Sequence, residues 1–260
     1  MAKLKILITG ASSGFGRGTA VGLAKDGHHV TATAQTWPQV RQLRADAEEA
    51  GVKLEVIKLD LLDDIDIEHA AKVETDVLVL NAGIQESGAV VDIPIERVRA
   101  SFDVNVFGHL RLVQAMAPTM VKRKRGRIVW MSSIAGLQPV PFLGAYSATK
   151  HAIEALAGTM RLELAPLGIS VATIAPAVFA TGFNDTGMES MNQWRDPSTA
   201  LVPVPDPRIA LKLQSDPQPM IDAMVEAISA RKQKYRTMRP EGAEAEVKAV
   251  QAAQWVDSVG

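Results

Sequence analysis

Short apolar runs rich in Val, Ile and Thr alternate with longer helical patterns through most of this chain, and this alternation restricts the fold more than any other feature of its 260 residues. Six such runs are expected to form strands, at residues 3–9, 28–34, 53–59, 76–80, 126–132 and 169–175. Helices are expected between them, at residues 14–25, 38–50, 63–72, 95–122 and 146–165. Such alternation is typical of βαβ units, whose right-handed crossovers place helices on both faces of a parallel sheet. The sequence therefore predicts an α/β fold, a doubly wound parallel sheet in a single domain over residues 1–260.

The periodicity weakens after Pro176, where several prolines and isolated apolar side chains follow. This segment is too apolar for a disordered tail, so we expect a substrate flap over a pocket at about 182–218. An amphipathic helix at 220–232, a last strand at 234–238 and a C-terminal helix at about 243–259 complete the predicted elements.

Charge and composition argue against several classes of function. Lys and Arg number 28 and Asp and Glu 29, so no net field attracts nucleic acid or an anionic membrane. The chain has no cysteine, which removes disulfides, thiolate nucleophiles and cysteine-based metal sites. The five histidines show no metal-ligand spacing on a shared helix face, so we expect no metal. No signal peptide precedes the first strand, and no apolar run approaches the roughly 20 residues of a membrane-spanning helix, so we expect a cytoplasmic protein.

The motif TGASSGFG at residues 9–16 lies between the first predicted strand and the first predicted helix. Gly10 would allow a tight turn, Gly14 would let the backbone approach a pyrophosphate, and Gly16 would let helix and strand pack closely. Free N–H groups and the dipole at the helix N-terminus favour a phosphate. Glycine-rich turns also occur as purely structural turns, but the strand before and the helix after favour a Rossmann-type dinucleotide site.

Tyr146 is one of two tyrosines, and Lys150 follows it one helical turn later. An isolated pair with this spacing is usually a surface pair on an amphipathic helix. Here it occurs in order with T-G-x-x-x-G-x-G, N-A-G at 81–83, a serine before the tyrosine, and P-x-x-x-x-T at 176–181. The set resembles the short-chain dehydrogenase/reductase family over residues 4–181. The resemblance implies an oxidoreductase that transfers a hydride between NAD(P)(H) and an alcohol, ketone or aldehyde.

The resemblance assigns four residues to catalysis: Asn105, Ser133, Tyr146 and Lys150. Tyr146 would be the general acid/base, and since a free phenol has a pKa near ~10, the charge of Lys150 would stabilise the phenolate. In the family this lysine also hydrogen-bonds the nicotinamide ribose. Ser133 resembles the serine that positions the substrate carbonyl, and Asn105 the asparagine that interrupts a long helix and holds a water in the proton relay. Taken alone, Ser133 could be a capping residue and Asn105 a polar spot on a buried helix.

The resemblance also assigns cofactor contacts along the carboxyl ends of the strands. They are Gly10, Ser12, Ser13, Gly14, Phe15, Gly16, Gln35, Asp60, Leu61, Asn81, Ala82, Gly83, Tyr146, Lys150, Pro176, Val178 and Thr181. Asp60 resembles the acid that meets the adenine amino group, although a helix cap would also explain it. Thr181 and the backbone at Val178 resemble the clamp on the nicotinamide carboxamide. Leu80 and Ala177 depart from the family, which often has Asn and Gly at these two positions.

The second predicted strand ends in TATAQTW, with Ala34 at the position where NAD-specific sites place an acid. A carboxylate there would repel a 2′-phosphate, and none is present. Gln35 and Thr36 offer neutral hydrogen bonds, and Arg17 or Arg41 could supply a cation. We therefore expect NADP as the preferred cofactor, with NAD as the alternative.

Two other functions remain as alternatives. A dinucleotide-binding sensor or regulator without turnover would share the fold, but it would not need Ser133, Tyr146 and Lys150. A sugar-nucleotide epimerase or dehydratase can share the tyrosine and lysine, but it usually needs a larger C-terminal domain.

The apolar flap indicates an apolar small-molecule substrate, an alcohol or ketone. Met188, Met191 and Trp194 would either line its pocket or pack the flap. Family members commonly form oligomers, and we expect a homodimer or homotetramer, with the dimer favoured because a helix replaces the family's C-terminal strand. The expected interface residues are Phe107, Leu110, Val113, Met116, Ile153, Leu156 and Met160.

Overall fold

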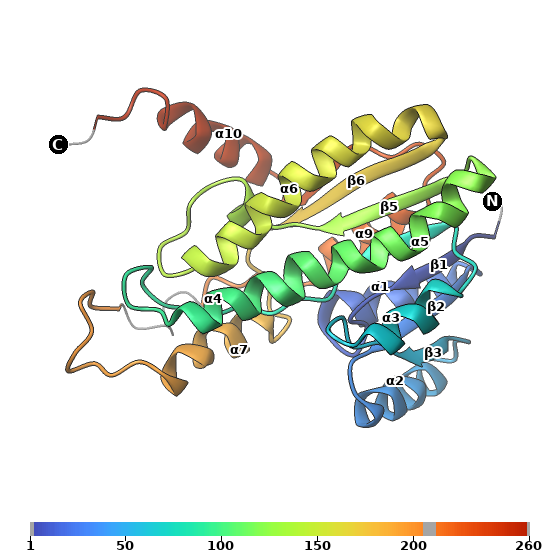
Figure 1. Cartoon of the computed structure of the whole chain (residues 1–260), viewed down its shortest axis with the longest axis horizontal. Coiled ribbons are helices and arrows are strands. Elements are labelled where there is room, and N and C mark those ends of the chain that lie inside the picture. Colours follow the sequence, from blue (N-terminus) through green and yellow to red (C-terminus); the bar gives the residue numbers. More distant parts are fainter. Residues whose placement is uncertain (1–2, 205–211, 259–260) are drawn as a thin grey trace.

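One seven-stranded sheet organises the chain, and the computed structural model describes residues 3–204 and 212–258 around it (Figure 1). The strands are β1 Lys5–Ile8, β2 His29–Ala34, β3 Glu55–Lys58, β4 Val77–Leu80, β5 Gly126–Met131, β6 Ile169–Pro176 and β7 Arg236–Arg239. All neighbouring strands pair in parallel, in the order β3-β2-β1-β4-β5-β6-β7. The predicted doubly wound sheet is confirmed. Its strand order reverses between β1 and β4, the place where open α/β sheets bind ligands.

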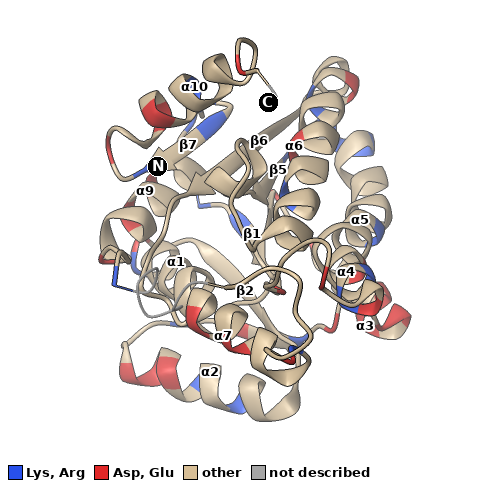
Figure 2. Cartoon of the chain, turned by 90° about the vertical axis from the view of Figure 1, so that its left-hand side faces the viewer, with Lys and Arg blue, Asp and Glu red and all other residues tan. Residues whose placement is uncertain are grey.

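Helices cover both faces of the sheet (Figure 1). They are α1 Gly14–Lys25, α2 Trp37–Glu49, α3 Asp64–Ala71, α4 Ile95–Phe102, α5 His109–Arg123, α6 Gly144–Leu164, α7 Phe183–Ser190, α9 Gln218–Ser229 and α10 Ala243–Ala253. In β1, Ile6 and Ile8 pack against α1, α2 and α9, whereas Leu7 packs with residues of α3, α5 and α6. Successive side chains of a strand point to opposite faces, so each buried strand contributes to both halves of the core. On α2 the basic residues Arg41 and Arg44 precede the acidic residues Asp46, Glu48 and Glu49, so the two signs are segregated along the helix (Figure 2).

The helix expected at 95–122 is interrupted. Between α4 and α5 lies a π-helical segment, Asp103–Gly108, with Asn105 inside it. Gly108 permits close packing there, because a Cβ on it would lie 2.8 Å from the Cβ of Leu61. A π-helical bulge re-aims the backbone groups of one helical turn and is frequent at functional sites.

The expected flap contains α7 and a 3₁₀ turn at Met191–Gln193. Residues 205–211 of the predicted flap lie outside the described residues.

The C-terminal helix is shorter than predicted. α10 ends at Ala253, whereas the sequence predicted a helix to about residue 259, which lies outside the described residues. Only Ala243 and Val247 of α10 are buried, and Trp255 is 90% exposed. Residues 254–258 are all exposed, so this part of the predicted helix lacks the packing on which helices this short depend.

Part of the predicted oligomer interface is wrong. Val113, Met116 and Ile153 are buried against the sheet of their own chain, so they cannot face a partner. Phe107 remains half exposed, at 51%. The periodicity of a helix between the sheet and solvent shows how wide its apolar face is, but not which part of that face the core uses.

Candidate active site

The glycine motif forms the turn between β1 and α1. Gly10 and Gly14 have φ of 64° and 51°, in the left-handed region that favours glycine. A Cβ on Gly10 would lie 2.6 Å from the Cα of Ala82, and one on Gly16 would overlap the Gly10 carbonyl, so both positions need glycine for close packing. Ser13, the N-cap of α1, makes no side-chain cap hydrogen bond. The first N–H groups of α1 have no partner within the helix, so this turn fits the diphosphate of a dinucleotide.

The end of β4 fixes this turn. The Asn81 side chain donates to the carbonyl oxygens of Thr9 at 2.9 Å and Gly10 at 3.0 Å. The Thr9 hydroxyl oxygen accepts from the backbone N–H groups of Asn81 at 2.9 Å and Ala82 at 3.0 Å. The structure therefore uses the side chain of Asn81 to hold the glycine turn. Thr9 had no predicted role; its place at the end of a strand, directly before the first glycine, was the available signal.

Tyr146 and Ser133 face one another at the carboxyl end of β5. Both are 7% exposed. Burial raises the pKa of the Tyr146 phenol above its ordinary value, and a hydrogen bond with the Ser133 side chain opposes that rise. Before cofactor binds, the phenol is therefore protonated at neutral pH. The Ser133 oxygen also accepts from the backbone N–H of Ala135 at 3.1 Å, so the expected capping role and the contact with Tyr146 occur together.

Lys150 lies beside Tyr146 on the buried face of α6. Its Nζ is 5.4 Å from the centroid of the Tyr146 ring and donates to the Met131 carbonyl at 2.8 Å. Burial lowers the pKa of Lys150 to about 7, and the nearby Glu154 carboxylate opposes this. The carbonyl at the end of β5 thus orients the amine toward the phenol.

Asn105 connects three segments. Its Oδ1 accepts from the Ile84 N–H at 2.8 Å, and its Nδ2 donates to the Ile84 carbonyl at 2.9 Å and to Thr149 Oγ1 at 3.1 Å. Thr149 Oγ1 in turn donates to the Tyr146 carbonyl at 2.7 Å. The amide is thus bonded to protein groups, and a water held by Asn105 stays a prediction.

The adenosine side of the expected site lies at the ends of β2 and β3. Gln35 donates to Asp60 at 3.2 Å, and Asp60 also accepts from the backbone N–H of Leu62 at 3.0 Å. The N-cap of α3 is Asp63, so the helix-cap alternative for Asp60 is wrong. The side chain of Leu61 is buried in the core, and its backbone carbonyl accepts from Arg111 Nη2 at 2.7 Å, so a cofactor contact at Leu61 stays a prediction.

Arg17 and Arg41, the two candidate cations for a 2′-phosphate, differ in whether a carboxylate pairs with them. Arg17 is paired with Asp46 at 2.8 Å, whereas Arg41 is exposed on α2. Arg41 is therefore the freer of the two to approach a 2′-phosphate.

The segment after β6 closes over the glycine turn. A Cβ on Gly14 would lie 3.2 Å from the Cβ of Thr181, which places the expected carboxamide clamp opposite the phosphate turn. The backbone carbonyl of Val178 accepts from Ser215 N–H at 3.0 Å. Pro176 ends β6, and Ala177 packs against the core beside it.

The predicted flap contacts Tyr146. The Phe183 ring of α7 lies 5.7 Å from the Tyr146 ring, a contact that sequence reasoning missed. Trp194 lies against Gly88, where an added Cβ would overlap its ring. Met191 is buried and Met188 half-buried, so Met191 and Trp194 pack the flap.

Several polar contacts hold the flap to the loop after β4, where the Asp92 carboxylate accepts from the backbone N–H groups of Leu201 and Val202, both at 3.1 Å. Ser190 Oγ accepts from the Ser87 N–H at 3.3 Å. Arg97 donates to both carboxylate oxygens of Glu86, at 3.1 and 3.0 Å, and to Gln193 Oε1 at 3.1 Å. These contacts hold the flap at Ser190, at Gln193 and at Leu201 and Val202.

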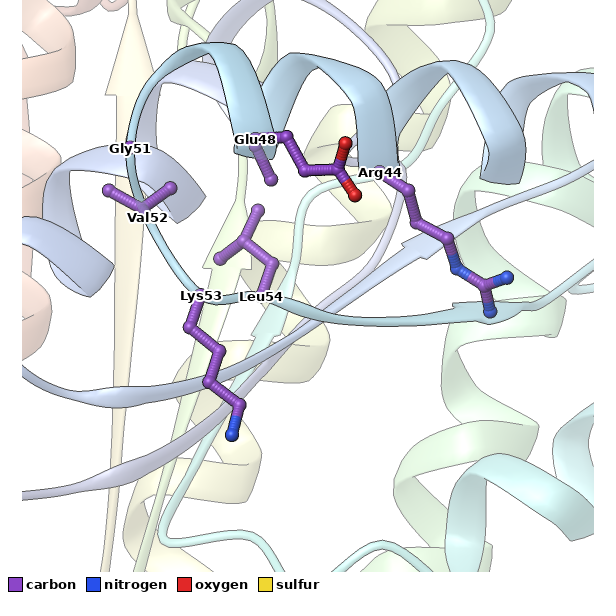
Figure 3. A pocket seen from close by; sticks show the side chains of 7 residues that line it. Arg44, Glu48, Gly51, Val52, Lys53 and Leu54 are labelled. Carbon is purple, nitrogen blue, oxygen red and sulfur yellow. The ribbon is translucent and has the colours of Figure 1, made fainter.

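A surface hollow lies away from these residues, where α2 leads into the edge strand β3 (Figure 3). Arg44, Glu48, Lys53 and Leu54 contribute to its lining. Arg44 donates to the Val56 carbonyl at 2.9 Å, so this arginine serves the α2–β3 packing.

Comparisons with known proteins agree with this geometry. A sequence profile described as short chain dehydrogenase matches residues 4–192. Retinol dehydrogenase 8 of Homo sapiens is 32% identical over 251 residues, covering 89% of this chain and 79% of that protein. 3-Ketodihydrosphingosine reductase of Bacteroides thetaiotaomicron is 37% identical over 186 residues, covering 69% and 65% of the two chains. A solved short-chain dehydrogenase from Sphingobium yanoikuyae in complex with NADPH has a TM-score of 0.76 and 27% identity, covering 97% of this chain and 94% of that chain.

This chain belongs to the short-chain dehydrogenase family. It is an NAD(P)-dependent oxidoreductase that acts on CH–OH groups. Over residues 3–204 and 212–258 this dehydrogenase has no group of three or more His, Asp or Glu placed to hold a metal ion. In the same ranges, none of its helices combines the length and the apolar character needed to cross a membrane.

Proposed function

We propose that this dehydrogenase interconverts an apolar secondary alcohol and its ketone with NADP(H), and that Tyr146 is the general acid/base. The contact of the buried Tyr146 phenol with Ser133 and Lys150, beside the carboxyl ends of β4 and β5, carries the proposal. When bound, the nicotinamide gives or accepts the hydride. The residues of the chain must then bind the substrate, exclude water and move one proton.

In the reducing direction, the Tyr146 phenol donates its proton to the carbonyl oxygen as the hydride reaches the carbonyl carbon. The phenol is protonated at neutral pH, as a proton donor must be, while the rise in its pKa on burial by itself makes it a weaker acid. The Ser133 hydroxyl, hydrogen-bonded to the phenol, is placed to hold the same substrate oxygen. In the oxidising direction, the positive charge of Lys150 beside the ring would stabilise the phenolate that removes the alcohol proton.

The flap supports an apolar substrate. The aromatic ring of Phe183 lies beside that of Tyr146, Met191 is buried, and the Trp194 ring packs against Gly88. The similarity to a retinol dehydrogenase and to a 3-ketodihydrosphingosine reductase favours the same choice, because retinol and 3-ketodihydrosphingosine both have long apolar portions.

The preference for NADP rests on Ala34 at the end of β2 and on the exposed Arg41. The relative solved with NADPH favours the same cofactor. Two further expectations remain predictions: a cytoplasmic location, and a homodimer or homotetramer that uses the exposed Phe107 on the π-helical segment. Light scattering that gives a monomer at micromolar concentration would contradict the assembly.

Incubation with NADPH or NADH and a panel of ketones of increasing chain length tests the proposal. We expect NADPH oxidation that depends on the ketone, with kcat/KM rising with the apolar length. Binding of NADPH without turnover of any ketone would favour the sensor alternative. Conversion of a sugar nucleotide without net cofactor oxidation would favour the epimerase alternative.

A further inference from the structure

His109 is a buried titratable residue with no part in the proton transfer proposed above. It opens α5, directly after the π-helical segment, and is 1% exposed. Its ring packs edge-on against Trp130, with the centroids 6.0 Å apart. A polar ring at such a depth is costly unless both of its nitrogens are hydrogen-bonded.

Both nitrogens of His109 have partners. Nε2 lies 3.0 Å from the Thr9 hydroxyl oxygen, and Nδ1 lies 3.1 Å from the backbone oxygen of Asn105. These partners belong to the two halves of the site, since Thr9 follows β1 directly before the glycine turn and Asn105 supports the helix of Tyr146.

The partners fix the tautomer of His109. The Thr9 hydroxyl oxygen already accepts the N–H groups of Asn81 and Ala82, so its own proton remains to be donated. Among residues 3–204 and 212–258, the one partner for that proton is Nε2, which must therefore be an unprotonated acceptor. The ring then carries its single proton on Nδ1 and donates it to the Asn105 carbonyl.

The surroundings of His109 favour the neutral ring. Burial, together with the positive charge of Lys150, lowers the pKa of His109 to about 4, although the hydrogen bond to Asn105 opposes this. A protonated ring would also leave the Thr9 hydroxyl without an acceptor.

We propose that His109 is a positioning residue that couples the cofactor-binding turn to the support of Tyr146. One hydrogen-bond chain runs from the N–H groups at the end of β4 through Thr9 and His109 to the Asn105 carbonyl. The Asn105 side chain continues it through Thr149 to the Tyr146 carbonyl. The inference rests on the proposed function only in taking Tyr146 as the catalytic acid.

The tautomer can be measured without any substrate. In ¹⁵N-histidine-labelled protein, we expect the His109 Nδ1 to be protonated and Nε2 to be bare, with no change between about pH 6 and 8. A proton on Nε2, or titration near the ordinary histidine pKa of about 6.5, would overturn the proposal.

Three substitutions separate the two hydrogen bonds. An Asn side chain reaches only the place of Nδ1, a Gln side chain reaches that of Nε2, and Leu makes neither bond. We expect His109→Leu to weaken NADPH binding and to lower kcat, each by about tenfold, the effect of roughly 1.4 kcal/mol. His109→Gln should restore the affinity for NADPH, and His109→Asn should restore kcat.

His151 provides the matched control. It also bonds the carbonyl four residues earlier, Ser147 at 2.9 Å, but it is exposed on α6 and has no other hydrogen-bond partner among residues 3–204 and 212–258. His151→Leu should therefore leave both the affinity for NADPH and kcat unchanged. If all three His109 variants behaved alike, or like His151→Leu, His109 would have no positioning role.

NADPH affinity is measured by cofactor fluorescence in the absence of ketone, and folding by thermal melting. If His109→Leu does not fold, the NMR result and the Gln and Asn variants still decide the question. Lack of turnover in the parent protein would reject the proposed function, while the tautomer and the affinity differences would still test the coupling.

Discussion

Arg97 on α4 bridges the loop after β4 and the flap, and its replacement tests whether this bridge holds the flap over Tyr146. It donates to both carboxylate oxygens of Glu86 and to Gln193 Oε1. The Arg97 and Glu86 side chains are 26% and 14% exposed, so solvent screens the pair only partly. In Arg97→Gln the shorter neutral side chain cannot reach both partners.

The loss in the free energy of unfolding of Arg97→Gln can be estimated from these hydrogen bonds. A hydrogen bond to a charged group contributes roughly 1.5–3 kcal/mol, and the partial exposure of this cluster places the total at about 2 kcal/mol. For a chain of this size, that corresponds to a fall in Tm of about 4–8 °C. The bond to Gln193 accounts for about 1 kcal/mol of it, so the flap should open about fivefold more often.

Hydrogen exchange of residues 183–194 measures this opening directly, and the KM for an apolar ketone should rise while the affinity for NADPH stays unchanged. Arg99→Gln is the control, because Arg99 is an exposed residue of the same helix whose 3.5 Å pair with Glu96 contributes less than about 1 kcal/mol. Exchange at the parent rate in Arg97→Gln, or an equal effect in Arg99→Gln, would refute the reasoning.

Three further predictions concern the cofactor and Lys150. Ala34→Asp should shift the ratio of kcat/KM values from NADPH toward NADH, because the new carboxylate repels a 2′-phosphate; a parent protein that already prefers NADH strongly would contradict this. Gly16→Ala should weaken NADPH binding at least tenfold, since its Cβ would overlap the Gly10 carbonyl, and an unchanged Kd by fluorescence titration would contradict it. Folding releases a proton from Lys150 between about pH 7 and its ordinary pKa of 10.5, because burial lowers the pKa in the folded state. The unfolded chain then binds more protons, so the free energy of unfolding should rise with pH in that window. Urea unfolding at pH 7 and 9 measures the rise, which Lys150→Met should lose.

The strands and most helices could be predicted because each buried segment carries its own periodicity. Runs such as KILI in β1 and VLVL in β4 need no distant information to be identified as buried strands. The C-terminal helix was predicted too long because its end depends on packing that the periodicity does not show, and Trp255 in fact faces solvent.

From the sequence, only those site residues could be predicted that belong to motifs occurring in a fixed order along the chain. The sequence predicted roles for Tyr146 and Lys150, whose spacing is local, but it gave no role to Thr9 or His109. Their side chains meet across 100 positions of sequence, and only the fold brings them together. The contact of Phe183 with Tyr146 could not be predicted for the same reason, because only the tertiary fold brings α7 next to α6.

Tyr146→Phe, with kcat and NADPH affinity measured on the same preparation, tests the central claim most directly. The variant keeps the ring that packs 5.7 Å from Phe183 and lacks only the hydroxyl. We expect kcat for ketone reduction to fall at least about 100-fold, the scale of a lost general acid, while the Kd for NADPH stays within about twofold. Near-parent turnover of any ketone that the parent reduces would contradict the proposed role of Tyr146.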